Sequence, residues 1–237
     1  MTDIERVGSG EDLSILCASA LRGGLVSACR MLHRDRGIGA TLSFDTTGGV
    51  LNRALAGSDN DVFAGTADAL EQLGQHGLTH LPVLVGSSRI AIGVRVGEAA
   101  PDTSTVEAFK ASLLAASCVA RGDPAGGGTA GQHIVRVFHA LNLTEEMRER
   151  SILRVGGYNV MAEVVTGNAD FGITQSTEIP TVAGAAIGGW LPDALQLTTV
   201  YGIALNVTAV HHETARVLHD FLLTADGRAC FEAAGFQ

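Results

Sequence analysis

The sequence alternates short apolar runs with longer helical segments along most of its length, and this alternation is the feature that most limits its fold. The runs at 13–18, 38–44 and 61–65 have the length and apolar character of buried strands, and a helical segment follows each of them. Strands that alternate with helices are typical of α/β folds with largely parallel sheets. We therefore expect an α/β fold, and 237 residues are enough for one large or two small domains.

The alternation continues to the C-terminus. Further helices are expected at 20–33, 50–57, 66–75, 104–115, 130–141, 144–150 and 158–166, with two more between 212 and 236. Further strands are expected at 117–120, 152–155, 171–174 and 198–207. Two closely spaced apolar runs, 81–86 and 89–96, separate the first series of strands and helices from the second.

The two series predict two lobes. We expect lobe 1 to comprise 1–92 and 197–237, and lobe 2 to comprise 93–196. Ligands in α/β folds lie at the carboxyl ends of strands, where helix N-termini converge. The expected ligand site is therefore a cleft between the lobes.

The charge of the chain narrows the class of ligand. A net charge of -9 argues against a nucleic-acid partner, because a basic face is needed to neutralise phosphates. A small anion remains compatible, since its site needs only a few local donors. Lys110 is the single lysine, so an anion clamp would consist of arginine and backbone amides.

Neither the cysteines nor the histidines have the spacing of a metal site. The four cysteines are widely spaced with no CxxC pair, and we expect them to be free thiols in packing positions. His133 and His139 lie on different faces of a helix, and the neighbours His211 and His212 point apart. We expect no metal and no cofactor.

The first residues, MTDIERVGSGEDLSIL, lack the charged and then apolar segments of a secretory signal. We expect a cytoplasmic protein, or a periplasmic or extracellular one if a leader has been removed. No apolar stretch reaches the roughly 18 uninterrupted residues of a membrane helix. We expect a monomer or a weak homo-oligomer.

A glycine-rich loop, GDPAGGGTAGQH at 122–133, leads into the apolar run IVRVFHAL and lacks the lysine of a phosphate-binding P-loop. Glycines let backbone N–H groups approach a ligand, and a helix N-terminus adds partial positive charge, so the loop favours an anion. A plain flexible connection is the alternative. Junctions of small polar residues at 18–22, 45–49 and 156–160 also favour an anion cleft, although such residues are ordinary caps too.

Four segments carry a resemblance to a known class of proteins. In order, CASALR, FDTTGGVLNRALAGSDNDVFAGT, GDPAGGGTAGQH and GNADFGITQSTEI resemble motifs of the periplasmic molybdate-binding proteins and the wider type II solute-binding proteins. The resemblance implies a two-lobed type II periplasmic-binding-protein fold with the ligand cleft between the lobes. The variant pattern of DPAGGGTAG, ITQSTEI and LPDALQLTTVY resembles the branch of this class that includes aconitate isomerase.

The resemblance also implies which residues bind the anion. Ala20 stands where the class has an oxyanion-binding serine, and Gln175 where it has a tyrosine. Two hydroxyl donors to a tetrahedral oxyanion are therefore missing, which disfavours such a ligand. Arg22 offers a planar fork that suits a carboxylate. The expected binding residues are Ser19, Ala20, Arg22, Thr46, Thr47, Thr66, Gly128, Thr129, Gly157, Tyr158 and Gln175.

The isomerase branch implies that a double bond is shifted in a small polycarboxylate such as aconitate. Glu178, which follows the strand at 171–174, is the first candidate for the base, and His133 is the second. A capping or ion-pair role is the alternative for Glu178, and a surface position for His133. For the whole protein, the alternative is a solute-binding protein that delivers molybdate or another small anion to an ABC permease, which requires export.

The proposed role of Arg22 generates a first prediction. Replacing Arg22 with Ala should weaken the binding of a carboxylate ligand by about 1.5 to 3 kcal/mol, the range of hydrogen bonds to charged groups. Isothermal titration of the wild-type protein and the variant with aconitate measures this difference. Equal affinities would remove Arg22 from the binding site.

Overall fold

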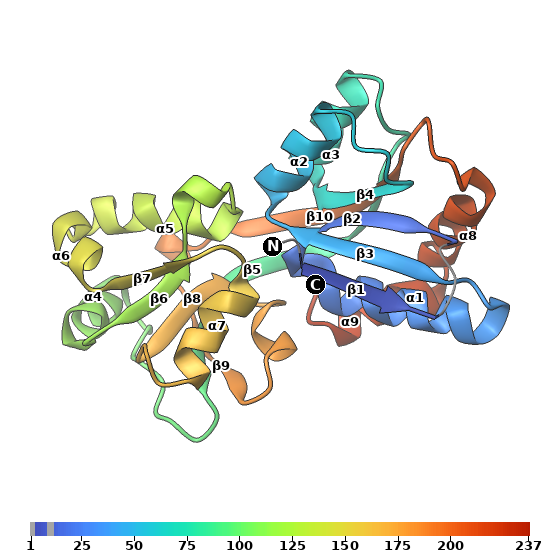
Figure 1. Ribbon diagram of the computed structural model, residues 1–237. Coiled ribbons are helices and arrows are strands. Elements are labelled where there is room, and N and C mark those ends of the chain that lie inside the picture. The colour runs from blue at the N-terminus through green and yellow to red at the C-terminus, as the bar shows by residue number, and fades with distance from the viewer. Residues whose placement is uncertain (1–2, 9–11) are drawn as a thin grey trace. The chain divides into compact units, whose positions relative to one another are not determined.

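The computed structural model describes residues 3–8 and 12–237, which fall into two compact units. Unit 1 comprises Met1–Ser87 and Val200–Gln237, and unit 2 comprises Ser88–Thr199 (Figure 1). Each unit contains a sheet with helices packed on it, so the predicted α/β class is confirmed. In the residues that the structure describes, no helix has both the length and the hydropathy that crossing a membrane needs.

The sheet of unit 1 has a parallel centre and antiparallel edges. Its strands follow the order β1 (Asp3–Val7), β3 (Ala40–Asp45), β2 (Ser14–Ala18), β4 (Val62–Thr66) and β10 (Thr198–Leu205). β2 runs parallel to both β3 and β4, whereas β1 and β10 pair antiparallel with β3 and β4. The carboxyl ends of three neighbouring strands therefore lie at one edge of this sheet, as a ligand site of an α/β fold requires.

Helices cover both faces of that sheet. α2 (Thr47–Leu55) and α3 (Ala67–Gln75) lie on one face in Figure 1, and α1 (Arg22–Arg36), α8 (His212–Leu222) and α9 (Ala225–Ala233) lie on the other. α1 and α9 approach closely because Gly24 has no side chain; a Cβ there would overlap the Phe231 ring. Apolar side chains such as Ile15, Leu42 and Phe63 form the core between the layers.

Unit 2 has a mixed sheet. Its strands follow the order β5 (Val83–Arg95), β8 (Phe171–Gln175), β6 (Val119–Gly122) and β7 (Ser151–Arg154), and β9 (Ala185–Trp190) pairs with β5. β6 is parallel to β7 and β8, while β5 is antiparallel to β8 and β9. β8 and β6 thus end side by side, and each leads into a segment that the sequence analysis assigns to the anion site.

Two separate apolar clusters hold the helices of unit 2 to its sheet. α4 (Val106–Ala115), α5 (Thr129–Ala140) and α6 (Thr144–Glu149) contribute to one cluster through Phe109, Phe138 and Met147. α7 (Gly157–Val165) contributes Val160 and Met161 to the other. Four short 3₁₀ segments complete the described elements: η1 (Ser19–Leu21), η2 (Pro124–Gly126), η3 (Ile179–Thr181) and η4 (Asp193–Leu195).

The expected elements are present within a few residues of their predicted bounds, with three differences. β1 lies in a polar segment that was expected to precede the first strand, and β9 was not expected. The apolar runs 81–86 and 89–96 form one strand, β5, instead of two elements. The sheets are also less parallel than predicted, because β1, β5, β9 and β10 pair antiparallel. β1 lies at the edge of its sheet and is mostly exposed, as antiparallel edge strands can be.

The cysteines are free thiols, and three of them are buried. Cys29 in α1 and Cys230 in α9 lie in the core of unit 1, where the Cys230 thiol is 3.4 Å from the Met31 sulfur. Burial, followed by the neighbouring Cys230 and Glu5, raises the pKa of Cys29 to about 12. A thiol with such a pKa is a packing group, because the reactive thiolate is not populated near neutral pH.

A buried carboxylate ties β2, β4 and the segment before α8 together. Asp61 Oδ2 accepts from the amide and the hydroxyl of Ser14 at 2.9 and 2.8 Å, and its Oδ1 accepts from the His211 amide at 2.9 Å. Burial by itself raises the pKa of Asp61, but the hydrogen bonds from His211 and Ser14 outweigh it and lower the pKa from its ordinary value. Asp61 therefore stabilises the fold in its ionised form.

The lowered pKa of Asp61 predicts acid sensitivity. A carboxylate with a folded pKa below its unfolded value contributes stability above about pH 4, and this contribution disappears as the pH falls through the folded pKa. Urea unfolding at about pH 7 and about pH 3 should show a smaller loss of stability in Asp61→Asn than in the wild type. The exposed Asp68→Asn is the matched control and should behave like the wild type; equal losses in all three proteins would contradict the assignment.

Candidate functional site

In unit 1, threonine side chains cap two helices at the carboxyl ends of parallel strands. Thr46 Oγ1 accepts from the Gly49 amide at 3.0 Å at the start of α2, and Thr66 Oγ1 accepts from the Ala69 amide at 3.4 Å at the start of α3. The caps place both threonine side chains at helix N-termini, where the partial positive charge attracts an anion.

The first junction of unit 1 is arranged differently. The Ser19 hydroxyl donates to the backbone oxygen of Asp45 at 3.0 Å, and Ala20 is buried. Thr47 is the first residue of α2 and lies beside Thr46. Ser19 thus links the end of β2 to the end of β3, and the structure brings these predicted binding residues to one edge of the sheet.

Arg22 is held by the N-terminal strand. Its guanidinium forms an ion pair with Glu5 at 3.2 Å and another with Asp3, and it lies 3.7 Å from the centre of the Phe44 ring. The side chain is 17% exposed. These contacts attach α1 to β1 and β3, and they favour a structural role for Arg22; its role in ligand binding stays a prediction.

The glycine-rich loop of unit 2 combines tight packing with a helix start. Gly127 has a φ of 71°, in the left-handed region that favours glycine, and α5 begins two residues later at Thr129. A Cβ on Gly131 would lie 2.8 Å from the Gly122 oxygen, so α5 packs directly on the end of β6. The N-cap residue of α5 is Gly128, which has no side chain to cap the helix. The first-turn amides of α5 are therefore suited to an external anion.

The N-terminus of α7 carries a carboxylate of the protein itself. Glu178 Oε1 accepts from the Gly157 amide at 2.9 Å, and its Oε2 accepts from the Thr174 hydroxyl at 2.6 Å. Glu178 is 7% exposed, and a Cβ on Gly157 would overlap its carboxylate. The structure brings the predicted Gly157 and Glu178 together, but as donor and acceptor, which matches the capping alternative for Glu178.

His133 and Gln175 are also engaged within unit 2. His133 Nε2 is 2.7 Å from the Leu195 carbonyl oxygen, and since a carbonyl only accepts, Nε2 is the donor. Gln175 donates from Nε2 to the Thr199 hydroxyl at 3.2 Å. Its side chain is 3% exposed, and Oε1 has no hydrogen-bond partner among the described residues. Tyr158, in the first turn of α7, is exposed.

The sequence analysis missed two polar groups at these junctions. Asp45 Oδ1 accepts from the Thr46 amide at 2.8 Å, and Asp45 Oδ2 lies 3.6 Å from Arg53. An aspartate at the end of a strand could have been assigned to the site from the sequence, but only the neighbouring threonines were. Thr174 was read only as part of a strand, although the buried polar run after 173 marks that strand end as unusual. Asp45 and Glu178 thus place a carboxylate at one helix start of each unit.

A buried arginine lies in β6, one residue before the glycine loop. Arg121 Nε donates to the Ser151 hydroxyl at 3.0 Å, and Nη1 has no hydrogen-bond partner within the described part of the chain. Burial lowers the pKa of Arg121, and Asp123 opposes this effect. Across residues 3–8 and 12–237, no group of three or more His, Cys, Asp or Glu side chains could hold a metal ion.

Sequence comparisons relate this chain to known proteins over nearly its whole length. The family model for bacterial extracellular solute-binding proteins matches residues 13–237. An aconitate isomerase from Pseudomonas sp. is 28% identical over 233 residues, which cover 95% of this chain and 87% of that protein.

Two solved structures show the fold. The periplasmic molybdate-binding protein of Azotobacter vinelandii has a TM-score of 0.78 at 17% identity and covers 95% of this chain and 98% of its own. The sulfate-binding protein of Mycobacterium tuberculosis has a TM-score of 0.73 at 14% identity, with 94% and 85% covered. The predicted two-lobed solute-binding fold is therefore confirmed.

The capping role of Glu178 predicts a stability effect. Glu178→Ala leaves the buried Gly157 amide and Thr174 hydroxyl without their acceptor, which should lower the free energy of unfolding by about 1 to 3 kcal/mol. Urea denaturation measures the change. Glu149→Ala removes an exposed glutamate from α6 and should change it by less than about 0.5 kcal/mol. Equal effects of the two substitutions would show that the hydrogen bonds of Glu178 contribute nothing to stability.

Proposed function

Because the chain belongs to the bacterial extracellular solute-binding proteins, we propose that it binds a small carboxylate anion at its helix N-termini and isomerises that anion by shifting a double bond. The observation that carries the isomerase proposal is the similarity to an aconitate isomerase along nearly the whole chain. The anion would be a small polycarboxylate such as aconitate. The expectation that one ligand meets both lobes stays a prediction.

The proposed contacts to the anion lie at helix N-termini. In unit 2, the first turn of α5 offers amides at Thr129 and beyond without a side-chain cap from Gly128. In unit 1, the capping hydroxyls of Thr46 and Thr66 lie at the starts of α2 and α3. These groups stabilise negative charge without rearranging, because the helices hold them in place.

The proposed reaction is a proton transfer along an allylic system. A base removes a proton from the carbon next to the double bond, and the electron pair of that C–H bond shifts to form a new double bond. The original double bond opens as its far carbon takes a proton, so the product is an isomer with no net oxidation. The intermediate spreads negative charge toward a carboxylate, and amides at a helix start stabilise this charge. Acid–base catalysis by one positioned group suffices for both proton transfers.

Glu178 is the proposed base. The hydrogen bonds from Gly157 and Thr174 fix the position of its carboxylate. His133 is the second candidate, because Nε2 donates to Leu195 and Nδ1 of a neutral ring can accept a proton. Asp45 adds a carboxylate at the α2 start that the sequence analysis had not considered.

The second candidate function is transport without catalysis. It is favoured by the family itself and by the similarity of the fold to molybdate-binding and sulfate-binding proteins. In that case the protein delivers a small anion to an ABC permease. Such a role needs a location outside the cytoplasmic membrane, whereas the cytoplasmic location expected from the sequence stays a prediction.

A ligand screen distinguishes the two functions. Molybdate, tungstate, sulfate, phosphate, citrate and both aconitate isomers are added separately, and a ligand that binds the folded state raises the melting temperature. Proton NMR then follows cis- and trans-aconitate over hours. Stabilisation by aconitate with interconversion of its isomers supports the isomerase. Stabilisation by molybdate or tungstate, with aconitate unchanged, contradicts it and supports transport.

The assignment of the base predicts the effect of Glu178→Gln. The glutamine keeps an oxygen that can accept from the Gly157 amide but removes the basic carboxylate. We expect kcat for aconitate to fall by about 100-fold or more, the usual contribution of a positioned base, while aconitate affinity changes little. Glu149→Gln is the control on α6. If Glu178→Gln retains full activity while His133→Gln loses it, His133 is the base instead.

A further inference from the structure

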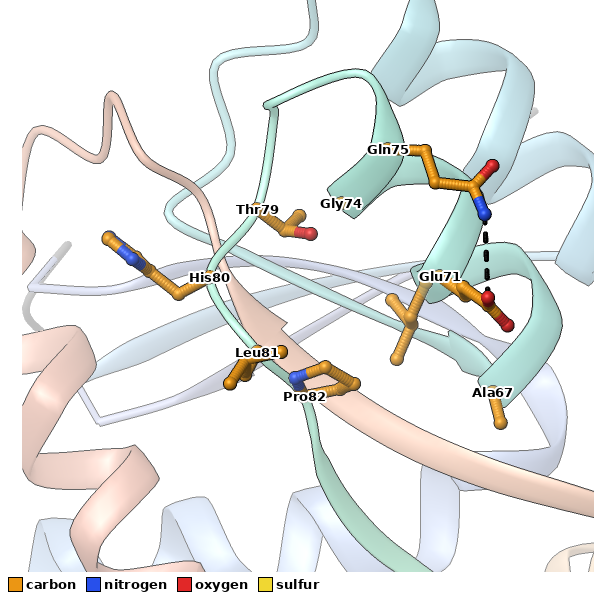
Figure 2. A pocket seen from close by; sticks show the side chains of 9 residues that line it. Ala67, Glu71, Gly74, Gln75, Thr79, His80, Leu81 and Pro82 are labelled. Carbon is orange, nitrogen blue, oxygen red and sulfur yellow. Dashed lines mark hydrogen bonds between the residues drawn. The ribbon is translucent and has the colours of Figure 1, made fainter.

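A pocket of about 520 Å³ lies within unit 1, between α3 and the segment 79–82 that leads into β5 (Figure 2). Its volume falls within the range of small-molecule sites in proteins. The pocket begins at Ala67, next to Thr66, and extends along the face of α3 that carries Leu70, Glu71 and Gly74. None of the residues assigned to the anion site lines it.

The walls of the pocket are mainly apolar. Leu70 forms part of its floor and is almost fully buried, while Leu81 and Pro82 form the opposite wall. Leu81 is 88% exposed, which is unusual for a leucine that borders a concave surface. A ligand with an apolar body would remove this side chain from water, and the area covered would favour binding.

One polar group points into the pocket from its inner side. Thr79 is 8% exposed, and its Oγ1 is buried with no hydrogen-bond partner among the residues that the structure describes. Figure 2 shows this oxygen directed toward α3, beside Gly74. A buried hydroxyl without a partner is costly, so it favours a ligand that carries a hydrogen-bonding group at this position.

Gly74 keeps the inner end of the pocket open. A Cβ added to Gly74 would find the Thr79 hydroxyl oxygen as its nearest neighbour at 3.9 Å, an ordinary contact, so the packing does not require glycine. Glycine in a helix is less stable than alanine by about 0.5 to 1 kcal/mol. The space that a side chain at Gly74 would fill therefore adjoins the Thr79 hydroxyl.

The charge at the rim selects the ligand class. Glu71 lies on the rim, where its Oε1 accepts from Gln75 Nε2 at 3.4 Å, and the His80 ring points away from the pocket (Figure 2). No lysine or arginine is among the nine described residues that line the pocket. The rim therefore favours a cation and disfavours the anions proposed above.

We propose that this pocket binds a small amphiphilic amine. Its apolar ring packs against Leu70, Leu81 and Pro82, a hydrogen-bonding group on the ring pairs with the Thr79 hydroxyl, and its ammonium group lies beside Glu71. This inference is independent of the anion function, because it rests on a different set of residues and on the opposite ligand charge.

Three indoles of similar size and different charge test the proposal: tryptamine, tryptophol and indole-3-acetate. Each is titrated into the wild-type protein and followed by ¹H–¹⁵N NMR. We expect saturable shifts around 67–82, with tryptamine binding most tightly and indole-3-acetate least tightly. Absence of saturable binding by all three, or tighter binding of indole-3-acetate than of tryptamine, would overturn the proposal.

Variants separate the individual contacts. Glu71→Gln should weaken the binding of tryptamine by about 2- to 5-fold, as expected for an exposed ion pair, and leave the binding of tryptophol unchanged. Thr79→Val keeps the side-chain shape but removes the hydroxyl. It should weaken the binding of all three indoles by about 2- to 10-fold, the range of one hydrogen bond. Equal tryptamine affinity in the wild type and both variants would contradict the assigned contacts.

A matched pair of leucine substitutions tests the pocket itself. Gly74→Leu fills the inner end and should abolish tryptamine binding, whereas Gln72→Leu adds the same side chain to α3 outside the pocket lining and should leave it intact. Thermal unfolding confirms that each variant is folded, and Thr79→Val tests the same space without added bulk. Full binding by a folded Gly74→Leu would overturn the proposal.

Discussion

Every helix start leaves backbone N–H groups without partners in the helix, and the group that satisfies them decides what each strand-to-helix junction of this protein can do. Threonine hydroxyls cap α2 and α3 at Thr46 and Thr66, and the Glu178 carboxylate caps α7. α5 starts after Gly128, which has no side chain to offer. An external anion can therefore meet the α5 amides without displacing a group of the protein.

The carboxylates at these junctions affect both affinity and chemistry. Asp45 and Glu178 each accept from an amide at a helix start, so each occupies a position that a ligand anion would otherwise take. Their negative charge opposes the binding of an anion, and the helix N-termini and the neighbouring Arg53 partly offset it. A carboxylate held beside bound substrate is also what proton transfer requires. In the proposed isomerase Glu178 is the base, whereas in a protein that only carries an anion it would serve as the cap of α7 alone.

The pocket beside α3 has the opposite electrostatic character. Its polar lining residues are Glu71, Gln75, Thr79 and His80, of which Glu71 carries a negative charge, and its other lining residues are apolar. The helix starts favour negative charge, whereas this rim favours positive charge, so the same ligand does not suit both places. The two proposals therefore assign ligands of opposite charge to different parts of unit 1.

The sequence by itself determined the α/β class and most of the element bounds, because apolar period, strand length and glycine content are local properties. Its assignment of an anion to the strand-to-helix junctions stays a prediction. The sequence did not reveal β1, whose polar residues pair with β3 and whose Glu5 accepts from Arg22 and Arg30. It also left open whether Glu178 is a cap, and it gave no sign that Thr79 is buried without a partner. Tertiary structure decided these points, since Glu178 and Gly157 are 21 residues apart and only packing selects such partners. The spacing of apolar residues within a segment indicates whether it is a helix or a strand. The hydrogen-bond partner of a side chain depends on which distant segment folds against it.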